Sequence, residues 1–181
     1  CKNDKEKATV LSVLAFKNPG RAMDQFKEIT DLHVNDELVD NLLIREINKM
    51  EDWYFSDRYL GYGMSINTYW SEDNIFDFVK DKNFQSDKLY LKSFMQMVID
   101  VVDKKNVENK GLWYTCIGYM AYMLDDEETT VKYLKLAAKN TQNPEIRAQI
   151  ATIDLLNMVK YENDWDEAFQ NDLMKGLKRL E

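Results

Sequence analysis

Residues 111–138, GLWYTCIGYMAYMLDDEETTVKYLKLAA, decide the fold class of this chain. Apolar side chains recur every three or four residues on both sides of the acidic run from Asp125 to Glu128, as amphipathic helices require. The acidic run predicts a turn and the start of a second helix, because negative charge near a helix N-terminus is stabilised by the helix dipole. The stretch therefore predicts an antiparallel helical hairpin.

The same pattern continues toward the C-terminus. Asn143-Pro144-Glu145 combines a capping side chain, a proline suited to the first helical position and an acid, and so predicts a helix start. Asn163-Asp164 predicts the start of a last helix. The predicted starts at Gly111 and Pro144 lie 144 − 111 = 33 residues apart, which suggests two helix pairs of similar length.

Residues 111–181 are similar to a degenerate tetratricopeptide (TPR) repeat, whose period is about 34 residues. Two positions depart from the pattern: Thr130 stands where Ala is usual, and Leu156 stands where the second pair should have a small residue. The resemblance implies stacked helix pairs with a concave groove for a peptide or partner domain. The alternative is an irregular helix bundle, which shares part of the pattern. Small residues stand where paired helices would approach closely: Gly118, Ala137 and Ala168.

The first 110 residues carry helical spacing without a recognisable repeat. No Val, Ile and Thr-rich alternating run of strand length competes with it. We therefore expect an all-α fold, an array of about eight helices in antiparallel pairs, with one helical domain over residues 8–181 after a flexible tether over 1–7. Helices are predicted over 8–16 and 21–29, after Asn35 as N-cap, after Ser71, and from Ser86-Asp87 to Lys104-Lys105.

Composition excludes several classes of function. The 181 residues carry 24 basic and 32 acidic side chains, a net charge of −8, with one His and two Cys. One His and two distant Cys argue against a Cys and His zinc site and against a disulfide scaffold. The negative charge without a Lys/Arg run argues against nucleic-acid binding. We expect no cofactor and no metal.

Catalysis is also not expected. His33, the only histidine, lies in a predicted loop, and every Cys–His or Ser–His–Asp site would need it. Cys116 lies inside an apolar helix and is predicted to be a buried, inert thiol. The densest acidic groups lie at predicted helix starts, where the helix dipole explains them. We therefore predict that the protein is not an enzyme.

The N-terminus resembles that of a mature bacterial lipoprotein. Cys1 is followed by a polar, highly charged run, KNDKEK, as in lipoproteins whose N-terminal Cys carries a lipid anchor. This resemblance implies lipidation of Cys1 and a cell-envelope location, on the periplasmic side or at the outer-membrane surface. The alternative is that Cys1 is a fragment boundary of a longer chain, which would then be cytoplasmic.

Residues 53–70, WYFSDRYLGYGMSINTYW, hold seven of the 22 aromatic side chains and form the candidate binding segment. Planar rings can stack on glycans, peptides or small ligands. The alternative is that these rings fill the core between helices. The candidate ligand-binding residues are Trp53, Tyr54, Tyr59, Tyr62, Tyr69 and Trp70.

Together these observations favour a non-catalytic protein-interaction or scaffold module of a membrane-anchored lipoprotein. Its partner would be a protein or peptide, and it would meet the membrane only through lipidated Cys1. Two alternatives remain open. One is a glycan- or small-ligand-binding envelope lipoprotein that uses the aromatic segment, and the other is an acidic immunity- or inhibitor-type protein that masks a basic target.

Overall fold

The computed structural model describes residues 3–55, 84–162 and 164–178 of the chain. Every regular element in these ranges is helical: eight α-helices and one π-helix, with no strand. The prediction of an all-α fold with about eight helices is therefore confirmed. The chain divides into two compact units, with the boundary after Val107. The prediction of one helical domain over 8–181 stays a prediction.

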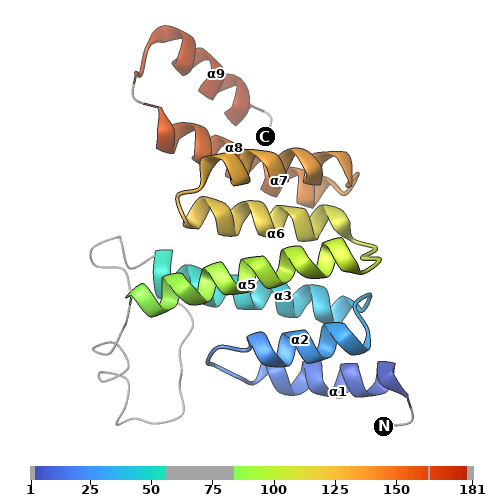
Figure 1. Cartoon of the computed structure of the whole chain (residues 1–181). Coiled ribbons are helices and arrows are strands. Elements are labelled where there is room, and N and C mark those ends of the chain that lie inside the picture. Colours follow the sequence, from blue (N-terminus) through green and yellow to red (C-terminus); the bar gives the residue numbers. More distant parts are fainter. Residues whose placement is uncertain (1–2, 56–83, 163, 179–181) are drawn as a thin grey trace. The chain divides into compact units, whose positions relative to one another are not determined.

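Unit 1 covers Cys1–Val107. Helices α1 and α2 form a pair, α3 packs against both, and α5 packs against α2 and η1 (Figure 1). The core lies between α2, α3 and α5, where the rings of Phe26 and Phe94 meet edge to face at 5.4 Å. The elements of unit 1 are α1 (Asp4–Phe16), α2 (Met23–Leu32), α3 (Glu37–Met50), the π-helix η1 (Glu51–Phe55) and α5 (Phe84–Lys104).

Unit 2 covers Glu108–Glu181. Helices α6 and α7 form a pair, α8 packs on both, and α9 packs on α8 (Figure 1). The first helices of the two pairs begin 144 − 110 = 34 residues apart, but the second helices begin 167 − 127 = 40 residues apart. The 34-residue spacing therefore holds for only one helix of each pair. The helices are α6 (Lys110–Met123), α7 (Glu127–Lys139), α8 (Pro144–Tyr161) and α9 (Glu167–Leu177).

Small residues allow close helix packing in unit 2, although not at every predicted position. A Cβ on Gly118 would lie 3.0 Å from Cδ2 of Leu134, and Ala137 is fully buried, so both are core positions as predicted. The prediction for Ala168 is wrong, because this residue is exposed on α9. Gly176 takes that role instead, because a Cβ there would collide with the Leu155 side chain of α8.

The helix starts follow from their capping side chains. Asn143 caps α8 as predicted, since its Oδ1 accepts hydrogen bonds from the first backbone N–H groups of that helix. The cap predicted at Asn35 is wrong. Asp36 caps α3 through its Oδ1, while the Asn35 side chain donates to the backbone oxygen of Asn106 at 2.8 Å.

Three further boundaries differ from prediction. The last helix begins at Glu167 rather than at Asn163-Asp164, because Asp166 provides the cap. Helix α5 begins at Phe84, two residues before the predicted start, and ends at Lys104 as predicted. Helix α1 begins at Asp4 with Asn3 as its cap, so residues 4–7, predicted to be part of a flexible tether, are helical. The helix predicted after Ser71 lies outside the described residues.

Candidate interaction surface

Two of the six candidate aromatic residues are buried. Trp53 and Tyr54 lie in η1, and their exposed fractions are 5% and 0%. Both rings are therefore buried, which fits the alternative that they fill the space between helices. The remaining candidates, Tyr59, Tyr62, Tyr69 and Trp70, lie outside the described residues, and for them the prediction stays a prediction.

A buried ion pair stands beside these rings. Glu46 and Lys49, three residues apart on α3, are both fully buried, and Lys49 Nζ pairs with Glu46 Oε2. The other carboxylate oxygen, Oε1, accepts hydrogen bonds from the backbone N–H of Ala22, at 3.0 Å, and from the Tyr90 hydroxyl. Lys49 Nζ also donates to the backbone oxygen of Gly20 at 2.6 Å. Both charges therefore hold backbone groups of the α1–α2 loop.

Arg21 fixes the same loop to α5. Its Nη2 atom donates to Ser86 Oγ and to Asp87 Oδ1, each at 2.7 Å. Its guanidinium carbon lies 5.1 Å from the centre of the Tyr90 ring, in cation–π geometry. The α1–α2 loop is thus held on one side by α3 and on the other by α5.

Burial shifts the pKa values of two groups in this cluster, Lys49 and Tyr90. It lowers the pKa of Lys49, against the opposing effect of the Glu46 carboxylate. Burial, and then the charge of Glu46, raises the pKa of Tyr90 far above its ordinary value, so the hydroxyl stays a donor. The Glu46 and Lys49 side chains each have contacts within the protein and none with solvent, so we interpret the cluster as a structural clamp on the loop.

The residues considered for catalysis belong to different elements of the chain. His33 follows α2 in the connection to α3, as predicted, and Cys116 is buried in α6, as predicted. In the acidic run, Asp125 pairs with Lys160 at 2.6 Å and Asp126 caps α7. Within the described ranges, no group of three or more His, Cys, Asp or Glu side chains is arranged to hold a metal ion.

Helix α1 exposes an apolar face. Its buried residues, Ala8, Ser12 and Ala15, turn toward the rest of unit 1. Val10, Val13 and Leu14 project elsewhere and are each about half exposed. A helix face that is exposed to water normally carries polar side chains. This face of α1 departs from that rule.

Helix α9 has a second exposed apolar strip in unit 2. Phe169 is buried, and Leu173 and Gly176 share its face, which packs on α8. Met174 and Leu177 lie beside that face and remain 54% and 45% exposed. The apolar surface of α9 is therefore wider than the area that α8 covers.

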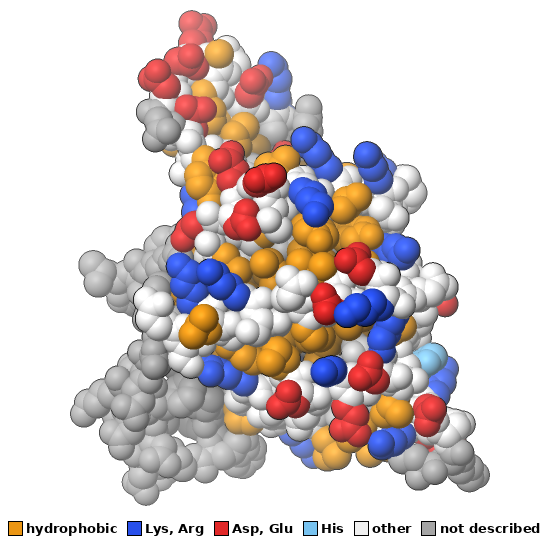
Figure 2. All heavy atoms as spheres, viewed as in Figure 1, with side chains coloured by type: hydrophobic (Ala, Val, Ile, Leu, Met, Phe, Trp, Pro, Cys, Tyr) orange, Lys and Arg blue, Asp and Glu red, His pale blue; other side chains and the backbone are white. Residues whose placement is uncertain are grey.

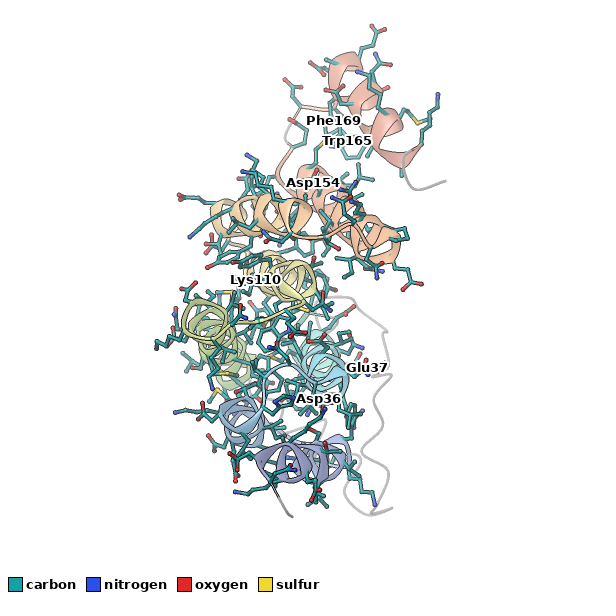
Figure 3. The ribbon with its side chains drawn as sticks, turned by 90° about the vertical axis from the view of Figure 1, so that its right-hand side faces the viewer. Asp36, Glu37, Lys110, Asp154, Trp165 and Phe169 are labelled. Atoms are coloured by element: carbon teal, nitrogen blue, oxygen red, sulfur yellow. The ribbon has the colours of Figure 1, made fainter. Side chains whose placement is uncertain are left out.

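Trp165 lies just before α9, beside the N-terminal end of this strip, where its ring contacts Phe169 of the packed face. Its ring is 54% exposed and lies 5.1 Å from the Phe169 ring, edge to face (Figure 3). We call Trp165, Gln170, Met174 and Leu177, with Glu167 at one end, the α9 strip. No sequence motif pointed to it. The sequence did contain one indication: the last helix has more apolar residues than a single packed face can bury.

Acidic side chains gather at the N-terminal end of the α9 strip, while Lys175 and Lys178 lie toward its C-terminal end. Figure 2 shows apolar and acidic side chains side by side in the region of this helix, with Lys or Arg side chains nearby. Two lysines of the region are paired within unit 2: Lys160 with Asp125, and Lys175 with Asp172 at 2.7 Å. The acidic side chains of residues 154–178 that are at least partly exposed are Asp154, Glu162, Asp164, Asp166, Glu167 and Asp172.

Comparison with protein-family models, with curated proteins and with solved structures found no match for this chain. Among the described helices, none is long and apolar enough to cross a membrane.

Proposed function

We propose that this chain is a non-catalytic protein-binding module built from helix pairs. The observation that carries the proposal is the presence of exposed apolar faces on helices that already have a separate, buried packing face, on α1 and on α9. Single exposed apolar residues are common on protein surfaces, but grouped ones at helical spacing mark surfaces that other proteins cover.

A TPR-like arrangement over residues 111–181 remains part of this proposal. The 34-residue spacing of α6 and α8, and the packing of α8 on both helices of the preceding pair, support it. The 40-residue spacing of α7 and α9 and the exposed Ala168 count against a regular repeat. We therefore propose a pair-stacked module whose binding surface is a helix face rather than a regular concave groove.

Attachment to a cell envelope through lipidated Cys1 is a separate proposal. Cys1 lies outside the described residues, so the sequence pattern alone supports it. Mass spectrometry of the protein isolated from its native membrane fraction tests it. We expect an N-terminal peptide whose mass includes acyl chains on Cys1, and an unmodified Cys1 thiol would exclude the anchor.

The protein-binding proposal is tested by affinity purification from native extract followed by reconstitution. The full chain serves as bait beside the variant V13D/L14D/M174D/L177D, which places charge on both exposed faces. We expect a protein that the native chain retains and the variant loses, and that binds the purified chain in calorimetry. The proposal is contradicted if no protein distinguishes the two baits, or if none binds after purification.

A further inference from the structure

We propose that the α9 strip binds a basic amphipathic helix of a partner protein. This inference rests on the proposed protein-binding function and adds to it the surface and the chemical class of the partner. Helix-in-groove recognition needs an apolar stripe on the receptor and charges that fix the orientation of the bound helix. Both features are present on α9.

The apolar part of the strip has helical geometry. Glu167, Gln170, Met174 and Leu177 follow one another at intervals of three, four and three residues, so they share one face of α9. That face differs from the packed one, which carries Phe169. A partner helix lying along the strip would cover Met174 and Leu177 at one end and the exposed ring of Trp165 at the other. Aromatic and methionine side chains are typical anchors of such surfaces.

The charges identify the partner as basic. The partly or fully exposed acids of residues 154–178 are Asp154, Glu162, Asp164, Asp166, Glu167 and Asp172, of which Asp172 pairs with Lys175. Lys178 is an exposed lysine at the other end of α9. Opposite charge raises the rate and specificity of association, whereas a like-charged partner would be repelled. Because the acids gather near the N-terminal end of α9, the lysines or arginines of the partner should lie at that end.

The polarity along α9 therefore predicts a pattern in the partner. Apolar side chains should recur at helical spacing and meet Met174 and Leu177. Basic side chains should border them at the end that meets Asp166 and Glu167. A neutral apolar helix would make only the apolar contact with Met174 and Leu177. An acidic amphipathic helix would make the same contact but would be repelled by Asp166 and Glu167.

The probes are two synthetic peptides of about 18 residues, or five helical turns. One places Leu on one face and Lys on the other, and the second replaces every Lys by Glu. Binding to the full chain is measured by calorimetry, and by protection of Trp165 from acrylamide quenching, with W165F as the reference. We expect the lysine peptide to bind at least about 10-fold more tightly than the glutamate peptide.

Four single variants locate the binding surface. M174D and E167K change the α9 strip, while L89D and E37K make the same kinds of change at exposed positions of unit 1. Glu37, labelled beside its cap Asp36 in Figure 3, is a close match for Glu167, because each is the first residue of a helix that an Asp caps. All four positions are exposed, so thermal unfolding should change little and will verify folding.

We expect M174D to weaken binding of the lysine peptide about 10-fold and E167K about 3-fold, while L89D and E37K stay within about 2-fold. E167K should also bind the glutamate peptide more tightly than the native chain does. Equal binding of the two peptides, or equal effects of the strip variants and the unit 1 controls, would overturn the inference.

The outcome can be separated from that of the proposed function. If affinity purification yields a partner whose binding survives M174D and E167K, this inference fails while the protein-binding function stands. Loss of that partner with V13D/L14D alone would place its site on α1. If no partner is found and neither peptide binds, both proposals fail.

Discussion

The two units fix their helices by opposite means. In unit 1 a fully buried ion pair, Glu46 with Lys49, bonds to the backbone of a loop and to Tyr90. In unit 2 the pair α6 and α7 meets where Gly118 leaves room for Leu134. Unit 1 therefore has charged side chains at core positions where apolar ones are usual, whereas unit 2 has a glycine, without a side chain, at the contact between α6 and α7.

Because of this difference, the two units should be sensitive to different kinds of substitution. A buried charge is tolerated only while its partner is present, because the interior cannot solvate it. A close helix contact is tolerated only while no atoms are added, because the interior is already packed to high density. Unit 1 should therefore be damaged most by removal of a group, and unit 2 by its addition.

The largest effect should come from removal of the Lys49 charge. Lys49→Met keeps the length of the side chain but leaves Glu46 buried without its cation and the backbone oxygen of Gly20 without its donor. We expect a loss of about 3–5 kcal/mol in the free energy of unfolding. Chemical denaturation followed by circular dichroism measures it.

Lys175→Met is the matched control, because Lys175 forms an exposed ion pair with Asp172 at the same three-residue spacing. Its loss should cost less than about 1 kcal/mol. Equal costs for Lys49 and Lys175 would remove the contrast between the units.

The next effect should come from addition of atoms at Gly118. Gly118→Val places methyl groups against Leu134, whose Cδ2 atom would lie 3.0 Å from the first added carbon. We expect a cost of about 1–3 kcal/mol, measured in the same denaturation experiment.

Gly118→Ala separates crowding from backbone effects. Alanine favours helix over glycine by about 1 kcal/mol, which should offset much of the cost of the close contact with the Leu134 side chain. A strongly stabilised Gly118→Val variant would show that the α6–α7 contact has spare volume, and would contradict the expectation that added atoms damage unit 2.

The buried cluster also predicts a dependence on alkaline pH. Because the pKa of Tyr90 is raised in the folded state, the native protein keeps a proton that the unfolded chain releases above about pH 10. Stability should therefore fall as pH rises above 10, by up to about 1.4 kcal/mol per pH unit. Denaturation curves at pH 9, 10 and 11 measure this slope.

Tyr90→Phe should reduce that slope, although it also lowers stability at neutral pH through the lost hydrogen bond to Glu46. The lowered pKa of Lys49 acts in the opposite direction, since the unfolded chain binds more protons up to the ordinary lysine pKa of 10.5. If the native protein and Tyr90→Phe lose stability equally as pH rises above 10, the pH dependence does not come from Tyr90.

Local signals predicted much of this fold. The Asn143-Pro144-Glu145 start and the close-packed Gly118 and Ala137 were correct because each depends on its own helix or its immediate partner. Asn35 failed as a cap because two adjacent residues could both fill the role, and only the contact with Asn106 distinguishes them.

The buried ion pair could not be predicted from local signals. Glu and Lys three residues apart on an amphipathic helix usually form a solvated pair, and the groups that bury them come from the distant α1–α2 loop and from α5. A hint existed, because Glu46 falls on the same face as the buried Leu42, Leu43 and Met50. The exposed α9 strip required knowing which face of α9 packs on α8.

The smallest effect should come from the α9 strip itself. Met174→Ser and Leu177→Ser replace half-exposed side chains, so each should change the free energy of unfolding by less than about 0.5 kcal/mol. Thermal denaturation measures it. A larger loss would mean that the strip belongs to the core of unit 2 and is unavailable to a partner.

The π-helix η1 has a consequence for how sequences related to this chain could vary in length. A π-turn holds one more residue than an α-turn, and here it buries three consecutive residues, Asp52, Trp53 and Tyr54. Deletion of one residue within Glu51–Phe55 would be absorbed by a return to α-helical winding, so only the side chains of the π-turn itself would change direction, among them Trp53, now 5.6 Å from Lys49 Nζ. The same deletion inside α3 would rotate every later side chain of that helix by about 100°. A one-residue deletion within Glu51–Phe55 should therefore be tolerated better than one inside α3.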